Sequence, residues 1–264
     1  MAMNWMVFDW LRRLLPSSSE LHHGEYAELG DQHWSGPVEG LPFETRGIPK
    51  TMLAKSAMES LGVRLAMTVD TKSRGESVDL NEPIVVPREV KLVTNFGTSE
   101  HVFDQAQLLE TCHRLCAVGG LMVHVVPMAG DLNHGFFNYQ PGLFVDLAST
   151  NSYQIVALDV VPMTAGQQVS RVGRRPVIVS LGTDTYERRI RDTVRIGIAR
   201  IRVRGSARLA MRGLRHRSFW KCYLSGDYLF VALRKRTDLA FVTPMQGRYR
   251  HAVGGAPPPP SPPR

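Results

Sequence analysis

An Asn- and His-rich loop, residues 133–138 with the sequence NHGFFN, carries the side chains best suited to move a proton. A histidine can act as a general base near neutral pH, and His134 is the candidate for that role. Asn133 and Asn138 flank it and could orient a substrate through their amide groups. Because a single loop histidine is often structural, both interpretations of His134 stay open.

A second polar turn, residues 95–101 with the sequence NFGTSEH, follows the apolar run VKLV. Thr98 or Ser99 is expected to cap a following helix, and Glu100 suits the positive end of that helix. Capping leaves the other members of the turn as candidates for the wall of a ligand pocket: Asn95, Gly97 and His101.

The two polar turns each follow a predicted strand, and a helical pattern lies between them. The pattern predicts a strand over residues 90–95, a helix over 103–116 that Gly119 and Gly120 stop, and a buried strand over 121–126 that Pro127 ends. This alternation implies right-handed crossovers and a mostly parallel sheet. Both polar turns then lie at the carboxyl ends of neighbouring strands, where open α/β sheets bind ligands.

Two acidic residues and a glycine end other predicted strands. Asp70 closes the strand over residues 63–70, where a carboxylate can accept both hydroxyls of a ribose, although a turn aspartate is an equal alternative. Glu28 and Gly30 end the first strand, and a glycine there lets the backbone approach a ligand closely. Asp79 and Asn81 could hydrogen-bond a purine amine, and turn chemistry explains them almost as well.

Several familiar motifs are absent from the sequence. No G-x-G-x-x-G follows Gly30, which argues against a dinucleotide cofactor. No G-x-S-x-G elbow and no H-E-x-x-H spacing occur, so we predict neither a hydrolase nor a metal site. The three cysteines, Cys112, Cys116 and Cys222, are too few for a disulfide framework and are expected to be core thiols in a reducing compartment.

The remaining elements complete an α/β arrangement. We expect helices over residues 3–15, 49–60 and 141–150, and strands over 26–30, 153–160 and 228–234. The helix over 3–15 is amphipathic and is expected to pack on the edge of the domain. The predicted organisation is an N-terminal helix in residues 1–20, an α/β domain over 21–250 with an Arg-rich, helical insertion at about 164–220, and a disordered Pro-rich tail over 251–264.

Composition and charge narrow the class of protein. The chain has 264 residues, 43% hydrophobic and 21% charged, which fits a globular protein. Residues 171–250 hold 20 Lys+Arg and 5 Asp+Glu, a net charge of +15, whereas the rest of the chain carries −7, which together give +8. That region could meet an anionic partner, but few aromatic residues interleave it, so we favour a solvated face over a nucleic-acid surface. No apolar run reaches the roughly 20 residues of a membrane span. Because no secretory signal opens the chain, we expect it to stay in the cytoplasm.

Four strings together resemble a group within the class I S-adenosylmethionine-dependent methyltransferases. They are DLNEP at residues 79–83, GTSEHVF at 97–103, NHGFFN at 133–138 and FVTPMQGRY at 241–249. The resemblance covers about residues 25–160 and the strand over 228–234. It implies a Rossmann-like, doubly wound seven-stranded sheet, mostly parallel, with an antiparallel last strand in a terminal hairpin.

The resemblance also implies a site for S-adenosylmethionine. Its cofactor-binding residues would be Glu28 and Gly30 at the methionine part, Asp70 at the ribose, Asp79 and Leu80 at the adenine, and Asn95 and Gly97 near the sulfonium, with His101 beside them. His134 and its neighbours would face the methyl acceptor. This sequence departs from the group in lacking the later glycines of the first loop, and in a neutral Asn95 where an acidic residue is common.

The predicted function is methyl transfer from S-adenosylmethionine to a small-molecule or glycan acceptor. The protein would mainly supply proximity and alignment, with His134 as the base when the acceptor is a hydroxyl. The alternative is an inactive module on the same scaffold that docks an anionic partner through its basic region. A nucleic-acid methyltransferase is the weaker third hypothesis, because no base-flipping Asn/Asp-Pro-Pro-Tyr motif occurs. The sequence indicates no oligomeric state.

Overall fold

The computed structural model describes residues 3–15, 24–36, 38–70, 78–130, 134–162, 179–180, 226–247 and 249. Four predictions lie partly or wholly outside these residues: the Arg-rich insertion, the Pro-rich tail, the role of Asn133 and the burial of Cys222.

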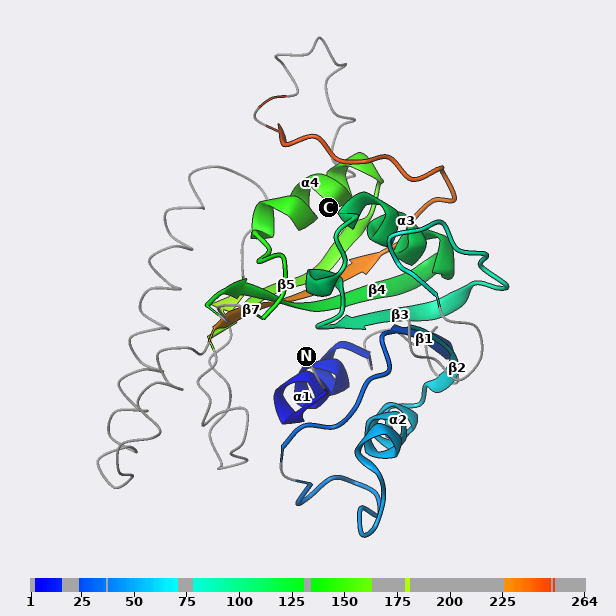
Figure 1. The fold of residues 1–264 in the computed structure, drawn as a ribbon, viewed down its shortest axis with the longest axis vertical. Helices are drawn as coiled ribbons and strands as arrows, with labels where there is room; N and C mark the ends of the chain where they lie inside the picture. The colour runs from blue at the N-terminus through cyan, green and yellow to red at the C-terminus, as the bar shows by residue number, and fades with distance from the viewer. Residues whose placement is uncertain are drawn as a thin grey trace, which may run out of the picture.

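A single mixed sheet organises the described chain (Figure 1). Its strands, in the order in which they lie side by side, are β2 (Arg64–Val69), β1 (Glu25–Leu29), β3 (Val90–Phe96), β4 (Cys116–Ala129), β7 (Asp227–Arg234), β5 (Gln154–Pro162) and β6 (Val179–Ser180). The pairs among the first four strands are parallel, whereas β7 is antiparallel to both β4 and β5. An α/β fold with a mostly parallel sheet and antiparallel strands is therefore confirmed.

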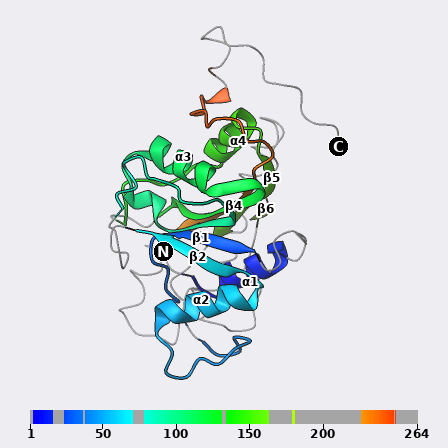
Figure 2. The ribbon, with the colours of Figure 1, turned by 90° about the vertical axis from the view of Figure 1, so that its right-hand side faces the viewer.

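Among the described residues, two helices cover each face of the sheet, which gives three layers (Figures 1 and 2). Helices α1 (Trp5–Leu14) and α2 (Lys50–Ser60) pack on one face, and α3 (Gln105–Leu115) and α4 (Pro141–Thr150) pack on the other. Each pair closes its own hydrophobic cluster against the sheet. Because both faces are covered, the central strands are buried along nearly their whole length, as in β3 and β7.

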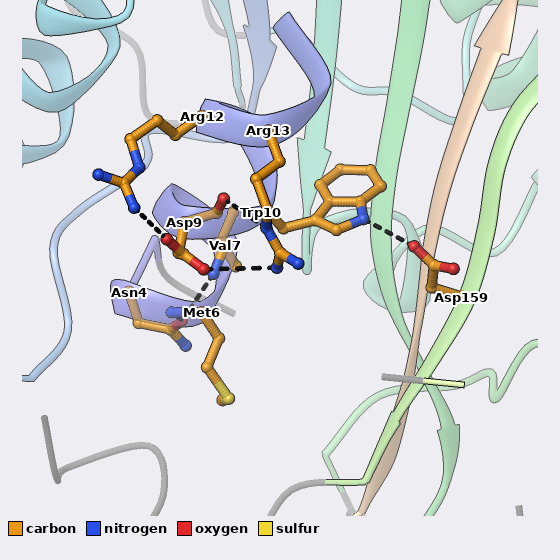
Figure 3. Close-up of polar contacts among 8 residues, drawn as sticks. All are labelled: Asn4, Met6, Val7, Asp9, Trp10, Arg12, Arg13 and Asp159. Carbon is orange, nitrogen blue, oxygen red and sulfur yellow. Dashed lines mark hydrogen bonds and ion pairs between the residues drawn. The ribbon is translucent and has the colours of Figure 1, made fainter. Parts of the chain in front are cut away.

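Helix α1 is built into the core, so the expectation that it packs on the edge of the domain was wrong. The side chain of Asn4 caps it by accepting from the backbone N–H groups of Met6 and Val7. The indole of Trp10 packs edge-on against Phe230 of β7 and donates a hydrogen bond of 2.8 Å to Oδ2 of Asp159 on β5 (Figure 3). Tertiary packing of an apolar face thus holds this short helix.

The connection from α3 to β4 differs from its prediction. Helix α3 begins at Gln105 behind an Asp104 cap, while Ser99–His101 forms a separate 3-10 turn, so neither Thr98 nor Ser99 caps the helix. The expected glycine stop was also wrong, because Gly119 and Gly120 lie inside β4. At Gly120 a Cβ would meet the Lys91 carbonyl oxygen at 2.8 Å, so the close approach of β3 requires glycine there.

A further expectation, about the end of β4, was wrong. Pro127 does not end its strand, since it pairs with Tyr228 of β7. Its missing N–H is tolerated because the β3 ladder has already stopped, at Phe96 opposite Val125. The last strand, β7, is antiparallel to both β4 and β5, as expected, and the terminal hairpin stays a prediction because most residues between β5 and β7 lie outside the described chain.

The segment after β7 returns over the outside of α3 and α4 (Figure 1). Asn151, just after α4, exchanges hydrogen bonds with the backbone of Val242 at 2.8 and 2.9 Å. The ring of Phe241 lies 5.9 Å from that of His113 on α3. Within the described part of the chain, we find no helix with the length and apolar character needed to cross a membrane.

Candidate functional site

The strand order creates a switch point at the carboxyl end of β1. The chain leaves β1 for β2 on one side and later returns to β3 on the other side. Loops after β1 and β3 therefore diverge at this point, where open α/β sheets form a ligand crevice. The predicted residues Gly30 and Gly97 each begin one of these two loops.

The ends of β1 and β2 are joined directly. The Gly30 N–H donates to the Val69 carbonyl at 2.8 Å, and the Asp31 N–H donates to Oδ2 of Asp70 at 3.1 Å. Asp70 is half-buried, so its carboxylate is accessible beside the turn that it holds. The structure thus brings Gly30 and Asp70 together, as predicted from their places at strand ends.

The ends of β1 and β3 meet through Thr98. Its hydroxyl donates a hydrogen bond of 2.7 Å to the Leu29 carbonyl. Its side chain also lies against Gly30, whose φ is +74°, so a Cβ at that position would collide with the Thr98 hydroxyl. Gly30 therefore serves two needs, a left-handed backbone and close contact with the loop after β3.

The amide of Asn95 is used inside the protein. The side chain is only 1% exposed, and its Oδ1 accepts from the backbone N–H groups of Thr98 and Ser99 at 3.3 and 3.1 Å. Its Nδ2 lies 2.8 Å from the Ser99 hydroxyl and 3.1 Å from Nδ1 of His124. Asn95 therefore shapes the turn over residues 97–99 from inside the protein.

Burial sets the protonation of His124 and Glu28. His124, on β4, is enclosed and burial lowers its pKa to about 4, so a neutral ring accepts the Asn95 amide at Nδ1. Glu28, on β1, is 1% exposed, and burial raises its pKa to about 7 despite a hydrogen bond from Thr68. Glu28 thus lies within the sheet next to β2 and away from open solvent.

The Asp79–Asn81 turn is held against both β2 and α3. The backbone N–H of Val78 donates to the Asp70 carbonyl at 3.2 Å, and Leu80 is buried. Asp79 accepts from the backbone and side chain of Asn81, bonds that lower the pKa of its exposed carboxyl. Oδ1 of Asn81 in turn accepts from the Phe103 and Asp104 N–H groups. Turn chemistry therefore accounts for the polar atoms of this segment, which lies beside Asp70.

The predicted catalytic loop lies beside the turn after β3. The ring centroids of His101 and His134 are 5.0 Å apart, and Nε2 of His134 is 3.6 Å from Oε1 of Glu100. Partial burial lowers the pKa of His101, while Glu100 acts in the opposite direction. Asn138 is exposed, and its Nδ2 lies 3.5 Å from the Gly130 carbonyl at the end of β4. Asn138 thus ties down the loop, whereas Asn133 lies outside the described residues.

Two residues of this edge, Gln32 and Glu100, were not predicted to organise it. The side chain of Gln32, in the loop after β1, is buried and donates a hydrogen bond of 3.1 Å to the Thr94 hydroxyl on β3. A polar side chain therefore fills the space between this loop and β3. Glu100 was interpreted only as a helix-end charge, yet its side chain is completely buried. The signal that could have drawn attention to it is the Glu-His pair after one strand, with a further histidine after the neighbouring strand.

A cavity of about 440 Å³ lies at the opposite edge of the sheet, near the start of β3 and the end of β7. Three basic and three acidic residues line much of it: Arg88, Arg114, Lys235, Glu89, Glu110 and Asp238. None of the predicted site residues contributes to its wall. The candidate site at the carboxyl ends of the strands is therefore defined by its loops and side-chain contacts, and not by this cavity.

No protein-family model matches this chain, and no curated protein matches its sequence. Solved structures that are similar include a SAM-dependent methyltransferase from Archaeoglobus fulgidus, at 12% identity over 86% of this chain and 93% of that chain, with a TM-score of 0.42. Phosphoethanolamine N-methyltransferase 2 from Haemonchus contortus, in complex with phosphomonomethylethanolamine and S-adenosylhomocysteine, has 12% identity over 87% and 53%, with a TM-score of 0.43. StiE O-MT has 14% identity over 88% and 75%, with a TM-score of 0.39. These structural neighbours are methyltransferases.

Proposed function

We propose that this chain binds S-adenosylmethionine at the carboxyl edge of its sheet and transfers the methyl group to a small-molecule or glycan acceptor. The observation that carries the proposal is the switch point between β1 and β3, where Gly30 and Gly97 open the two diverging loops and Asp70 lies beside them. In this proposal the described strands belong to a seven-stranded, Rossmann-like sheet.

The chemistry of these residues suits a nucleoside without phosphates. A half-buried carboxylate at the end of β2 can accept two ribose hydroxyls. The positive φ angles of Gly30 and Gly97, +74° and +76°, let the backbone approach a ligand. The proposed cofactor-binding set is Glu28, Gly30, Asp70, Asp79, Leu80, Asn95, Gly97 and His101, with Glu28 and Asn95 acting from beneath the loops because their side chains are buried.

The residues of the chain would then align the acceptor and manage its proton. A bound S-adenosylmethionine supplies a methyl group on an already activated sulfur, so alignment provides most of the rate. His134 is 40% exposed on its loop and can take a proton from an acceptor hydroxyl. Asn133 and Asn138 would orient the acceptor on either side of it.

Binding of the cofactor is the first test. Calorimetry and thermal unfolding with S-adenosylmethionine and S-adenosylhomocysteine should show binding and a raised unfolding temperature. Asp70→Asn keeps an oxygen for the Asp31 N–H but loses the charge that ribose hydroxyls prefer, and should bind about tenfold more weakly or worse. The matched control is Asp9→Asn on α1, whose carboxylate forms ion pairs with Arg12 and Arg13 on a helix that packs against a face of the sheet.

An inactive binding module on the same scaffold is the second candidate. The observation that favours it is the filled loop after β1, where Thr98 lies against Gly30 and Gln32 bonds to Thr94. Absence of heat and of a thermal shift at a large excess of both ligands would support this candidate against the enzyme. Binding to a polyanion that weakens steeply with salt would then identify the class of its partner.

A further inference from the structure

Three side chains that could ligate a metal ion meet at the carboxyl edge. Glu100 and His101 come from the 3-10 turn after β3, and His134 comes from the loop after β4. One carboxylate oxygen and one nitrogen from each imidazole all lie within 4.8 Å of one another. A search of the described residues for three or more histidine, cysteine or acidic side chains at a metal-ligand spacing finds this cluster.

The carboxylate of Glu100 requires an explanation of its own. The residue is 0% exposed, and neither carboxylate oxygen has a hydrogen-bond partner among the described residues. Nε2 of His134 lies 3.6 Å from its Oε1. Because a buried carboxylate is costly unless it is paired, hydrogen-bonded or bound to a metal, both of its oxygens are suited to bind a cation.

The backbone is shaped to hold His134 against Glu100. The Phe136 and Phe137 N–H groups both donate to the Glu100 carbonyl, at 2.7 and 3.3 Å. A Cβ at Gly135 would lie 2.7 Å from that carbonyl oxygen and 2.9 Å from Cγ of Glu100, so this close packing requires glycine. The loop after β4 is therefore fitted onto Glu100 by its backbone as well as by its histidine.

We propose that Glu100, His101 and His134 bind a divalent transition-metal ion, with Zn²⁺ as the best match. Two imidazoles and one carboxylate are a common zinc ligand set, whereas Mg²⁺ and Ca²⁺ prefer oxygen ligands alone. Ligand atoms around a tetrahedral Zn²⁺ are separated by about 3.3 Å, so small side-chain rotations would bring the cluster to that spacing. Both histidines are exposed, which leaves room for a further ligand from solvent.

Metal binding at this site can be measured without any acceptor, although the site shares His101 and His134 with the residues proposed for methyl transfer. It also sets a limit on His134. A nitrogen that ligates Zn²⁺ cannot accept a proton at the same time, so metal binding through Nε2 and the role of general base at that atom are alternatives. If His134 binds Zn²⁺ through Nε2, it cannot serve as the general base at that atom.

The test is a calorimetric titration of the full chain, freed of metal with a chelator, with Zn²⁺. We expect one Zn²⁺ per chain in the wild type. Glu100→Gln preserves the shape of the side chain and should weaken Zn²⁺ binding at least tenfold, the lower bound for disturbing a metal site. His134→Ala should do the same. His33→Ala removes an exposed histidine outside the cluster and should leave Zn²⁺ binding unchanged.

Thermal unfolding separates loss of binding from loss of folding. Without metal, Glu100→Gln should unfold at the same temperature as the wild type or higher, because it removes a buried charge. Added Zn²⁺ should then raise the unfolding temperature of the wild type and leave that of the variant unchanged. If Glu100→Gln does not fold, the exposed His134→Ala provides the same comparison. Absence of Zn²⁺ binding by the wild type, or equal affinity in the wild type and either folded variant, would overturn the proposal in favour of a simple Glu100–His134 ion pair.

Discussion

The hydroxyl of Thr68 donates a hydrogen bond of 2.7 Å to Oε1 of Glu28, joining β2 to β1 inside the sheet. This single bond does not offset the burial of the carboxyl, because the pKa of Glu28 is raised to about 7. The folded protein therefore binds a proton at Glu28 more tightly than the unfolded chain does.

Replacing Glu28 by glutamine should change how stability depends on pH. A raised folded-state pKa contributes stability that is complete below the unfolded value of 4.5 and is lost as pH rises through about 7. Glu28→Gln should therefore exceed the wild type in free energy of unfolding above pH 7, by on the order of 3 kcal/mol, and the advantage should shrink toward pH 4.5. Urea unfolding between pH 4.5 and 8 measures this difference.

Glu25→Gln is the matched control on the same strand. Its carboxylate forms ion pairs with Arg64 at 2.6 Å and Arg88 at 2.9 Å at the protein surface. Such exposed pairs contribute little, so this variant should show no gain in stability above pH 7. A constant difference between Glu28→Gln and the wild type across the whole pH range would contradict the proposed burial effect.

Alanine at Gly30 should destabilise the fold more than alanine at a glycine with the same backbone. Gly30 and Gly47 have φ angles of +74° and +73°, so each alanine would bear a strain of roughly 1–2 kcal/mol. Only at Gly30 would the new Cβ also meet Thr98, whereas nothing lies within 4 Å at Gly47. The extra loss in Gly30→Ala should be about 1–3 kcal/mol, as in other overpacked sites, measured by urea unfolding.

A second substitution distinguishes crowding from strain. Thr98→Ala removes the atoms that a Cβ at Gly30 would strike, along with the bond to the Leu29 carbonyl. The double variant should therefore lose less than the sum of the two single variants. Simple additivity would show that Thr98 does not crowd this position.

The sequence predicted most elements of the fold because apolar runs bounded by turn residues identify buried strands and helices. The helix predicted over residues 141–150 is confirmed as Pro141–Thr150, and the strand predicted over 90–95 extends by one residue. The length of β4 could not be predicted in this way. Hydrogen bonds of Gly119 and Gly120 with Lys235, and pairing of Pro127 with Tyr228, draw these residues into the strand against their local preferences.

The candidate site was predictable in its place but not in its orientations. The order and direction of the strands alone bring Gly30, Asp70 and Gly97 to one edge of the sheet. Periodicity cannot show that Asn95 turns inward toward His124, or that Glu100 is buried with neither oxygen bonded within the described chain. Those orientations depend on side-chain packing between β3, β4 and their loops, which a local sequence pattern does not contain.

The indole of Trp10 should contribute measurably to stability through Asp159. Trp10→Phe keeps the aromatic contact with Phe230 but removes the donor of a buried 2.8 Å hydrogen bond (Figure 3). We expect a loss of about 1–3 kcal/mol in free energy of unfolding, since the bond involves a carboxylate. Arg12→Ala on the exposed side of the same helix should lose at most about 0.5 kcal/mol. Equal losses in the two variants would show that this buried bond adds nothing.

His124 should oppose Glu28 in the response of stability to acid. Burial lowers the pKa of His124 to about 4, so its contribution is complete above the unfolded value of 6.5 and is lost as pH falls toward 4. His124→Gln keeps an acceptor for Asn95 and should therefore gain stability over the wild type as pH falls from 6.5 to 4, by on the order of 3 kcal/mol.

Between pH 4.5 and 6.5, Glu28 and His124 change the free energy of unfolding with pH in opposite directions. Glu28 lowers stability with rising pH and His124 raises it, each by about 1.4 kcal/mol per pH unit. The two lie on β1 and β4 with β3 between them, roughly 10 Å apart, so their effects should add. Relative to the wild type, Glu28→Gln should then steepen the rise with pH and His124→Gln should reverse it. The double variant should run parallel to the wild type, and a double variant that follows either single variant would show that only one of the two shifts is real.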